Sequence, residues 1–213
     1  EEQALGRGIV HSQTLVRHRP NCKPFEPGRS IMAGSALRCR FGLVGCGAPA
    51  VLNMILDAAA EWKGPIPGAG RVRIVVAGAP PPTRTIERCE TELGWEFVQI
   101  YGLTETAPVL TMNRGRAEWD DLTAGERATL LNRAGAPVIG CTMDADAEGE
   151  VLARGNMIME GYWEQPEATA EAIRDGFFHT GDGGSIEATN YVTINDRKKD
   201  VIISGGENVS SIE

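Results

Sequence analysis

Residues 71–100 contain two short apolar runs with a helical pattern between them. The runs 71–77 and 95–100 are rich in valine, isoleucine and phenylalanine, as expected of buried strands. Apolar residues of the segment 83–93 recur at helical spacing, and Gly94 follows, a residue common just past a helix end. This order predicts a βαβ unit with parallel strands and a right-handed crossover, and hence an α/β fold class.

Two loops, 78–82 and 101–106, would then leave the carboxyl ends of neighbouring strands, the edge at which open α/β sheets bind ligands. The second loop, 101–106, contains more side chains that could bind a ligand. The ring of Tyr101 can stack on a base, and the hydroxyl of Thr104 can bond a phosphate. The carboxylate of Glu105 can hold Mg²⁺, which shares oxygen ligands with phosphates. A strand end followed by a capped turn is the alternative interpretation.

The second half of the chain changes character after Gly140. Short segments at 150–154, 177–180, 185–187 and 191–195 have strand-like patterns. A short helix is expected over 167–173, where proline precedes the helical residues. The pattern predicts a small β-barrel-like or sandwich subdomain.

Asp182 is the next candidate for chemistry. It follows Gly181 at an expected strand end, where a carboxylate can accept hydrogen bonds from both hydroxyls of a ribose. The alternative is a turn aspartate that caps its own backbone. The charged run 196–200, taken alone, is typical of a solvated surface.

Charge and composition exclude several classes of function. The formal net charge of −8 disfavours a nucleic-acid surface, which needs clustered lysine and arginine. Apolar runs are too short for a transmembrane helix, and residues 1–3 do not resemble a signal peptide. The five cysteines lack C-x-x-C spacing, and the histidines form no H-E-x-x-H pattern, so no zinc site is indicated. Free thiols favour a reducing, cytoplasmic location.

Several of these segments together resemble the adenylate-forming (AMP-binding) enzyme superfamily, and most of all its medium- and long-chain fatty acyl-CoA synthetases. The resemblance rests on Gly78-Ala79-Pro80, on Tyr101-Gly102-Leu103-Thr104-Glu105 and on the run 149–169. It implies that Gly78, Ala79, Pro80 and Gly102 belong to the nucleotide site and that Tyr101 stacks on adenine. It also implies that Thr104 meets phosphate and that Glu105 binds Mg²⁺.

The same resemblance extends toward the carboxyl end of the chain. Asp182 and Arg197 match residues that contact the ribose, and Lys199 matches the pivot of a hinge to a further domain. Gly205 and Gly206 match a loop that swings into the site, and glycine tolerates the backbone changes of such a motion. Thr104, Glu105 and Lys199 are therefore the expected catalytic residues.

The implied reaction joins a carboxylic acid to coenzyme A at the expense of ATP, with Mg²⁺ present, through an acyl-adenylate and release of AMP. The implied organisation is a poorly readable segment 1–42, an α/β adenylate-binding subdomain 43–139, a β-rich subdomain 140–196 and a hinge 197–213. Two parts typical of the superfamily, a phosphate loop with its lysine and a lysine of the further domain, are not found in the sequence. The chain is thus expected to be a piece of a larger enzyme, inactive alone.

Two alternatives remain at this point. One is an amino-acid adenylation domain, although the sequence of residues 202–208 favours the CoA-ligase branch. The other is a remnant that binds AMP without catalysis. A dinucleotide dehydrogenase is disfavoured because no G-x-G-x-x-G follows a strand.

Overall fold

A computed structural model describes residues 43–197, 202–204 and 207–209. The segment 1–42, Lys199 and the glycines 205–206, to which the sequence assigned roles, lie outside these ranges. In chain order the helices and strands are β1 (Leu43–Gly47), α1 (Pro49–Glu61), β2 (Val72–Val76), α2 (Thr83–Thr91), β3 (Glu96–Tyr101), η1 (Thr104–Thr106), β4 (Thr111–Arg114), η2 (Ala117–Trp119), α3 (Ala124–Leu131), β5 (Ala136–Pro137), β6 (Cys141–Ala145), β7 (Glu150–Gly155), α4 (Pro166–Ala172), β8 (Ile173–Arg174), β9 (Phe177–Ile186), β10 (Val192–Arg197), β11 (Ile202–Ser204) and β12 (Glu207–Val209).

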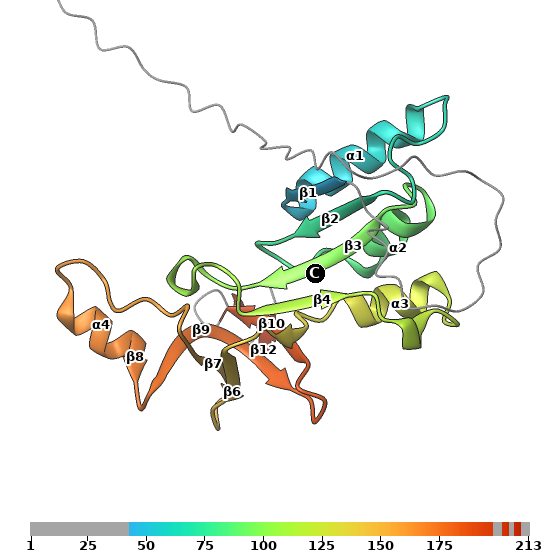
Figure 1. The fold of residues 1–213 in the computed structure, drawn as a ribbon. Helices are drawn as coiled ribbons and strands as arrows, with labels where there is room; N and C mark the ends of the chain where they lie inside the picture. Colours follow the sequence, from blue (N-terminus) through green and yellow to red (C-terminus); the bar gives the residue numbers. More distant parts are fainter. Residues whose placement is uncertain (1–42, 198–201, 205–206, 210–213) are drawn as a thin grey trace, which may run out of the picture. The chain divides into compact units, whose positions relative to one another are not determined.

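The first sheet has the strand order β1-β2-β3-β4-β5 (Figure 1). Strands β1, β2 and β3 are parallel neighbours, while β4 and β5 run antiparallel. The predicted βαβ unit is therefore confirmed as β2, α2 and β3, and the loops after β2 and β3 leave the same edge of the sheet.

Helices α1, α2 and α3 supply the apolar residues that cover this sheet. Proline opens α1 at its first turn, where a missing N–H costs nothing, and Leu52 and Leu56 one turn apart are fully buried. Thr123 caps α3: its hydroxyl accepts from the backbone N–H of Glu126, whose carboxylate accepts from the N–H of Thr123. These helices and strands share one core cluster: Leu52, Leu56, Ile74, Val76, Ile86, Cys89, Leu93, Phe97, Ala128 and Leu131.

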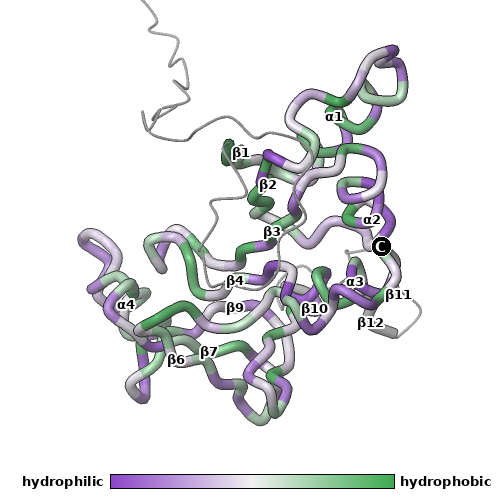
Figure 2. Tube along the Cα trace, turned by 45° about the vertical axis from the view of Figure 1, so that its right-hand side comes forward, coloured by the Kyte–Doolittle hydropathy of each residue, from purple (hydrophilic) through white to green (hydrophobic). Residues whose placement is uncertain are grey.

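Hydropathy along the chain fits this layering. In Figure 2 the strands β1 and β2 are mostly hydrophobic and β3 is mixed, whereas α2 is mostly hydrophilic with a few hydrophobic positions. On α2 the buried side chains are Thr85, Ile86 and Cys89, so one side of the helix packs on the sheet. Burial raises the pKa of the Cys89 thiol to about 12, which keeps this thiol protonated and unreactive.

The second sheet is antiparallel, with the order β10-β9-β7-β6 and β8 paired to β9. It is open rather than closed on itself, so the expected barrel-like subdomain is wrong in this respect. The strand patterns were recognisable, but closure depends on which strands pair, and β6 and β10 do not pair with each other. The two strands expected at 177–180 and 185–187 are also one continuous strand, β9.

A small apolar cluster lies between the two sheets. It is formed by buried Ala134, Val151 and Val192, with Tyr101 and Met143 packed against it. A backbone bridge joins Gly135 to Val192, and the Arg133 guanidinium lies 4.2 Å from the centre of the Tyr191 ring. The segment after α3 is thereby tied to the start of β10. Among the described residues, no helix is both long and apolar enough to cross a membrane.

Candidate functional site

Tyr101 is the last residue of β3, and the chain after it turns back tightly to β4. The N–H of Leu110 donates to the Tyr101 carbonyl at 2.8 Å. A Cβ on Gly102 would lie 1.8 Å from the carbonyl oxygen of Pro108, a distance that no pair of non-bonded atoms tolerates. The glycine after Tyr101 is thus needed for the close approach of two backbone segments.

Thr106 fixes the short turn η1 that follows. Its side chain is fully buried, and its hydroxyl donates to the Leu103 carbonyl and accepts from the Leu103 N–H, each at 2.9 Å. Pinned in this way, the turn leaves the side chain of Thr104 exposed. The hydroxyl expected to meet phosphate is therefore accessible at the sheet edge.

Glu105 is held from a distant segment. Its Oε1 accepts a hydrogen bond from the Tyr162 hydroxyl at 3.0 Å, and its carbonyl accepts from the Met159 N–H at 2.8 Å. Partial burial raises the pKa of Tyr162, and the hydrogen bond to the Glu105 carboxylate raises it further. Sequence reasoning gave Tyr162 no role, because nothing local connects it to Glu105.

Asp182 lies on β9 in the second sheet, with only 5% of its surface exposed. Its Oδ2 accepts a hydrogen bond of 2.7 Å from the Tyr101 hydroxyl, although the two residues are 81 positions apart. The expected base-stacking ring and the expected ribose carboxylate therefore meet. The alternative of a turn aspartate that caps its own backbone is wrong, since Asp182 lies inside a strand.

The backbone register adds Arg197 to this group. In the antiparallel pairing of β10 with β9, Arg197 stands directly opposite Asp182. Residues opposite each other on adjacent strands have Cβ atoms about 5 Å apart. The two positions that the sequence assigned to one ribose are thus cross-strand neighbours.

The loop of Gly78, Ala79 and Pro80 follows β2, next to β3 in the sheet. The carbonyl of the adjoining Pro81 accepts a hydrogen bond of 2.7 Å from the side chain of Asn132, just after α3. Helix α3 thereby ties down the far end of the loop.

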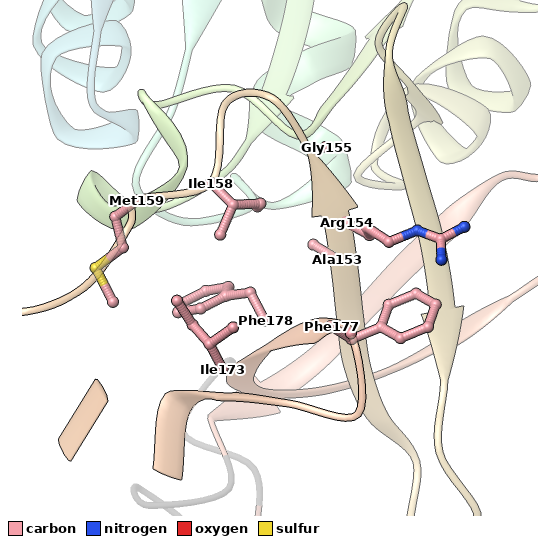
Figure 3. A pocket seen from close by; sticks show the side chains of 9 residues that line it. Ala153, Arg154, Gly155, Ile158, Met159, Ile173, Phe177 and Phe178 are labelled. Carbon is pink, nitrogen blue, oxygen red and sulfur yellow. The ribbon is translucent and has the colours of Figure 1, made fainter. Parts of the chain in front are cut away.

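A separate hollow of about 250 Å³ lies beside α4 and the start of β9 (Figure 3). Its walls include the apolar side chains of Ile158, Met159, Ile173 and Phe178, and Arg154 also lines it. The Arg154 side chain extends away from these four residues, and its guanidinium lies 5.1 Å from the centre of the Phe177 ring. Neither Tyr101 nor Asp182 lines this hollow.

Three potential metal ligands also come together on the second sheet. Ligand atoms of Asp146, Glu150 and His179 all lie within 4.8 Å of one another. Oε1 of Glu150 already accepts from the Gly181 N–H at 2.9 Å, and Oε2 lies 3.2 Å from Nδ1 of His179. Oδ1 of Asp146 accepts from two backbone N–H groups of its own turn. These contacts give the cluster a structural explanation within the chain.

The sequence matches the profile of the family described as AMP-binding enzyme over residues 40–163. It is 44% identical to 2-methylpropanoate–CoA ligase CCL4 of Humulus lupulus, over 79% of this chain and 32% of that protein. It is 37% identical to the peroxisomal trans-cinnamate:CoA ligase of Petunia hybrida, over 79% of this chain and 31% of that protein. The chain thus spans about a third of the length of the curated relatives it matches.

The fold resembles solved structures as well. O-succinylbenzoate coenzyme A synthetase from Bacillus subtilis, solved in complex with ATP and magnesium ion, superposes with a TM-score of 0.63 at 24% identity. The superposition covers 78% of this chain and 34% of that one. At this identity the similarity establishes the α/β fold alone, and it does so across most of the described residues.

Proposed function

Because the chain belongs to the AMP-binding enzyme family, we propose that it is part of an ATP-dependent carboxylate–CoA ligase. The observation that carries this proposal is the 2.7 Å hydrogen bond between Tyr101 and Asp182, with Arg197 opposite Asp182 on the neighbouring strand. An aromatic ring, a carboxylate and a guanidinium-bearing position gathered at the carboxyl edge of a parallel sheet suit an adenosine.

In this proposal the nucleotide lies along the edge of the first sheet. Tyr101 stacks on the adenine, and the loop of Gly78, Ala79 and Pro80 lines the other side of the base. Stacking on an aromatic ring is worth about 1–3 kcal/mol per base. Gly102 keeps the backbone close to Pro108, and Leu103 then leads into the phosphate-facing turn.

The ribose and the phosphates follow from there. Asp182 accepts hydrogen bonds from the ribose hydroxyls and Arg197 adds a further contact, while the exposed hydroxyl of Thr104 donates to a phosphate. Hydrogen bonds to charged groups are worth about 1.5–3 kcal/mol each. Lys199 is proposed as the pivot of a hinge over residues 197–213, after subdomains 43–139 and 140–196.

Glu105 suits Mg²⁺ in its donor chemistry. Mg²⁺ is usually held by one or two carboxylates together with substrate phosphates. One oxygen of Glu105 accepts from Tyr162, which orients the carboxylate at the sheet edge beside Thr104. When bound, Mg²⁺ would neutralise negative charge on the phosphates.

The reaction would proceed in two steps. The carboxylate of the acid attacks the α-phosphate of ATP, and the bond to pyrophosphate breaks. The thiol of coenzyme A then attacks the acyl carbon of the adenylate, and AMP leaves. The protein forms no covalent bond in either step, so positioning and electrostatics carry the rate. The residues named above bind and orient the nucleotide part.

The acid is proposed to be a small or medium-sized monocarboxylate. The sequence resemblance favours fatty acids, while the two relatives are named for 2-methylpropanoate and trans-cinnamate. A cytoplasmic location remains a prediction, since the Petunia hybrida relative is named as peroxisomal. Localising a tagged protein by microscopy would decide between these two compartments.

The test of function uses the intact protein with ATP, Mg²⁺, coenzyme A and a panel of acids that includes 2-methylpropanoate, butyrate, octanoate, cinnamate and amino acids. We expect pyrophosphate release that depends on one class of monocarboxylate, together with its CoA thioester in mass spectrometry. Acid-dependent release with amino acids alone would support the adenylation-domain alternative. AMP binding without any acid-dependent release would support the non-catalytic alternative.

A further inference from the structure

Asp182 does not occupy a regular position on β9. In the pairing of β7 with β9, Glu150 stands opposite Gly183 and Leu152 stands opposite His179. Three residues of β9, Thr180 to Asp182, therefore face the single residue Val151 of β7. This is a β-bulge, which bends the strand and redirects a side chain. Gly181 has a φ of +74°, a conformation that favours glycine.

A bulge removes ladder hydrogen bonds, and two side chains replace them here. The Thr180 hydroxyl donates to the Val151 carbonyl at 2.7 Å and accepts from the Asp182 N–H at 3.1 Å. The Glu150 carboxylate accepts from the Gly181 N–H at 2.9 Å through Oε1. Both residues that flank the peptide bond before Asp182 thus have their backbone N–H groups held by side chains.

Glu150 is itself held on its other oxygen. Oε2 lies 3.2 Å from Nδ1 of His179 and 3.9 Å from a terminal nitrogen of Arg174. The side chains of Glu150 and His179 are only 12% and 11% exposed, so solvent competes little with these contacts. A carboxylate fixed on both oxygens is a rigid support for the backbone that it binds.

We propose that Glu150 is a positioning residue that aims the Asp182 carboxylate at Tyr101 and at the ribose, by holding the N–H of Gly181. The inference rests on the proposed nucleotide site, because it concerns the orientation of that site's carboxylate. Glu150 lies on a different strand from Asp182 and does not contact the nucleotide in this arrangement. Its removal would let the bulge relax and would misdirect Asp182.

The experiment measures affinities for AMP and for 2′,3′-dideoxy-AMP by calorimetry on the intact protein. Glu150→Gln keeps an oxygen that can accept from Gly181, whereas Glu150→Asp keeps the charge but shortens the reach. We expect the Gln variant to bind AMP within about twofold of the wild type, and the Asp variant to lose about two- to tenfold, the range of one hydrogen bond. The loss of affinity should be confined to AMP, because the dideoxy analogue lacks the ribose hydroxyls that would donate hydrogen bonds to Asp182.

Two further variants complete the design. Glu148→Ala is the matched control, an exposed acidic residue in the same turn, and should bind AMP like the wild type. Asp182→Ala separates the two hypotheses: if it binds AMP as tightly as the wild type, the proposed nucleotide site is wrong. If it weakens AMP while Glu150→Asp does not, the site stands and the positioning role of Glu150 is wrong. Equal losses in the Gln and Asp variants would also contradict the role.

Discussion

Tyr101 and Asp182 share one hydrogen bond, but their backbones are supported in different ways. The turn after Tyr101 is fixed from within, by the close approach at Gly102 and by the hydroxyl of Thr106 on Leu103. The bulge at Asp182 is fixed from β7, a strand about thirty positions earlier, through Glu150. The first half of the site is thus a local structure, and the second half exists only if two strands pair in one register.

The largest effect is expected from a substitution in the turn after Tyr101, the locally supported half of the site. Gly102→Ala would place a Cβ against the Pro108 carbonyl and should destabilise the protein by about 3 kcal/mol or more, at the upper end for overpacking. The measurement is urea denaturation. Gly115→Ala is the control, because a Cβ there meets nothing within 4 Å and should change the free energy of unfolding by less than about 0.5 kcal/mol. Similar stabilities for the two variants would contradict the local constraint.

The next prediction compares the same substitution in the two halves. Thr180→Val and Thr106→Val each remove a buried hydroxyl that both donates and accepts, and each should cost about 2 kcal/mol. In double mutants with Glu150→Asp, Thr180→Val should show a coupling energy of about 0.5 kcal/mol or more, since both substitutions weaken the support of one bulge. Thr106→Val should be additive. Coupling in both pairs would remove the distinction between local and distant support.

Substitutions of Tyr101 test the hydrogen bond to Asp182 that joins the two halves of the site. Tyr101→Ala should weaken AMP binding about tenfold, because it removes base stacking worth about 1–3 kcal/mol. Tyr101→Phe keeps the ring and should retain AMP affinity, while losing folding stability with the hydrogen bond to Asp182. Calorimetry and denaturation of the same samples separate the two effects. Unchanged AMP affinity in the Ala variant would contradict stacking.

The smallest effect is expected at the hydrogen bond between Tyr162 and Glu105. Glu105 belongs to the turn after Tyr101, but this contact comes from a segment far along the chain. Tyr162→Phe removes an exposed hydrogen bond and should cost about 0.5 kcal/mol at pH 7. The folded-state pKa of Tyr162 is raised, so its contribution is present below pH 10.0, the ordinary tyrosine value, and is lost as the pH rises through the folded pKa. Denaturation midpoints of the two proteins should therefore converge above pH 10. A constant difference would count against the Glu105 contact.

The sequence was sufficient for the parts that depend on short-range patterns. The two apolar runs, the helical spacing between them and Gly94 predicted β2, α2 and β3 correctly, and the two loops at the strand ends lie on the predicted edge. The meeting of Tyr101 with Asp182 agrees with the site expected from the family resemblance. The roles of these residues toward a nucleotide stay predictions.

Long-range pairing explains what the sequence could not predict. The four glycine and aspartate residues at 181–184 are typical of a turn, yet β10 and β7 pair on both sides and keep β9 continuous. The contacts of Glu150 and Tyr162 join residues 29 or more positions apart, so no local pattern identifies them. Closure of the second sheet likewise depends on partners, and not on the strand patterns that suggested a barrel.

The Tyr101–Asp182 bond also has a consequence for the order of folding. The bond joins residues 81 positions apart, and the entropic cost of closing a loop rises with the length of the loop. Contacts between residues far apart in sequence form late and slow the folding of a domain. The first sheet, whose parallel strands are joined by short crossovers, should therefore gain its helices and strands before the bond forms. Competence to bind AMP should appear in a slower phase of refolding than the far-ultraviolet circular dichroism signal.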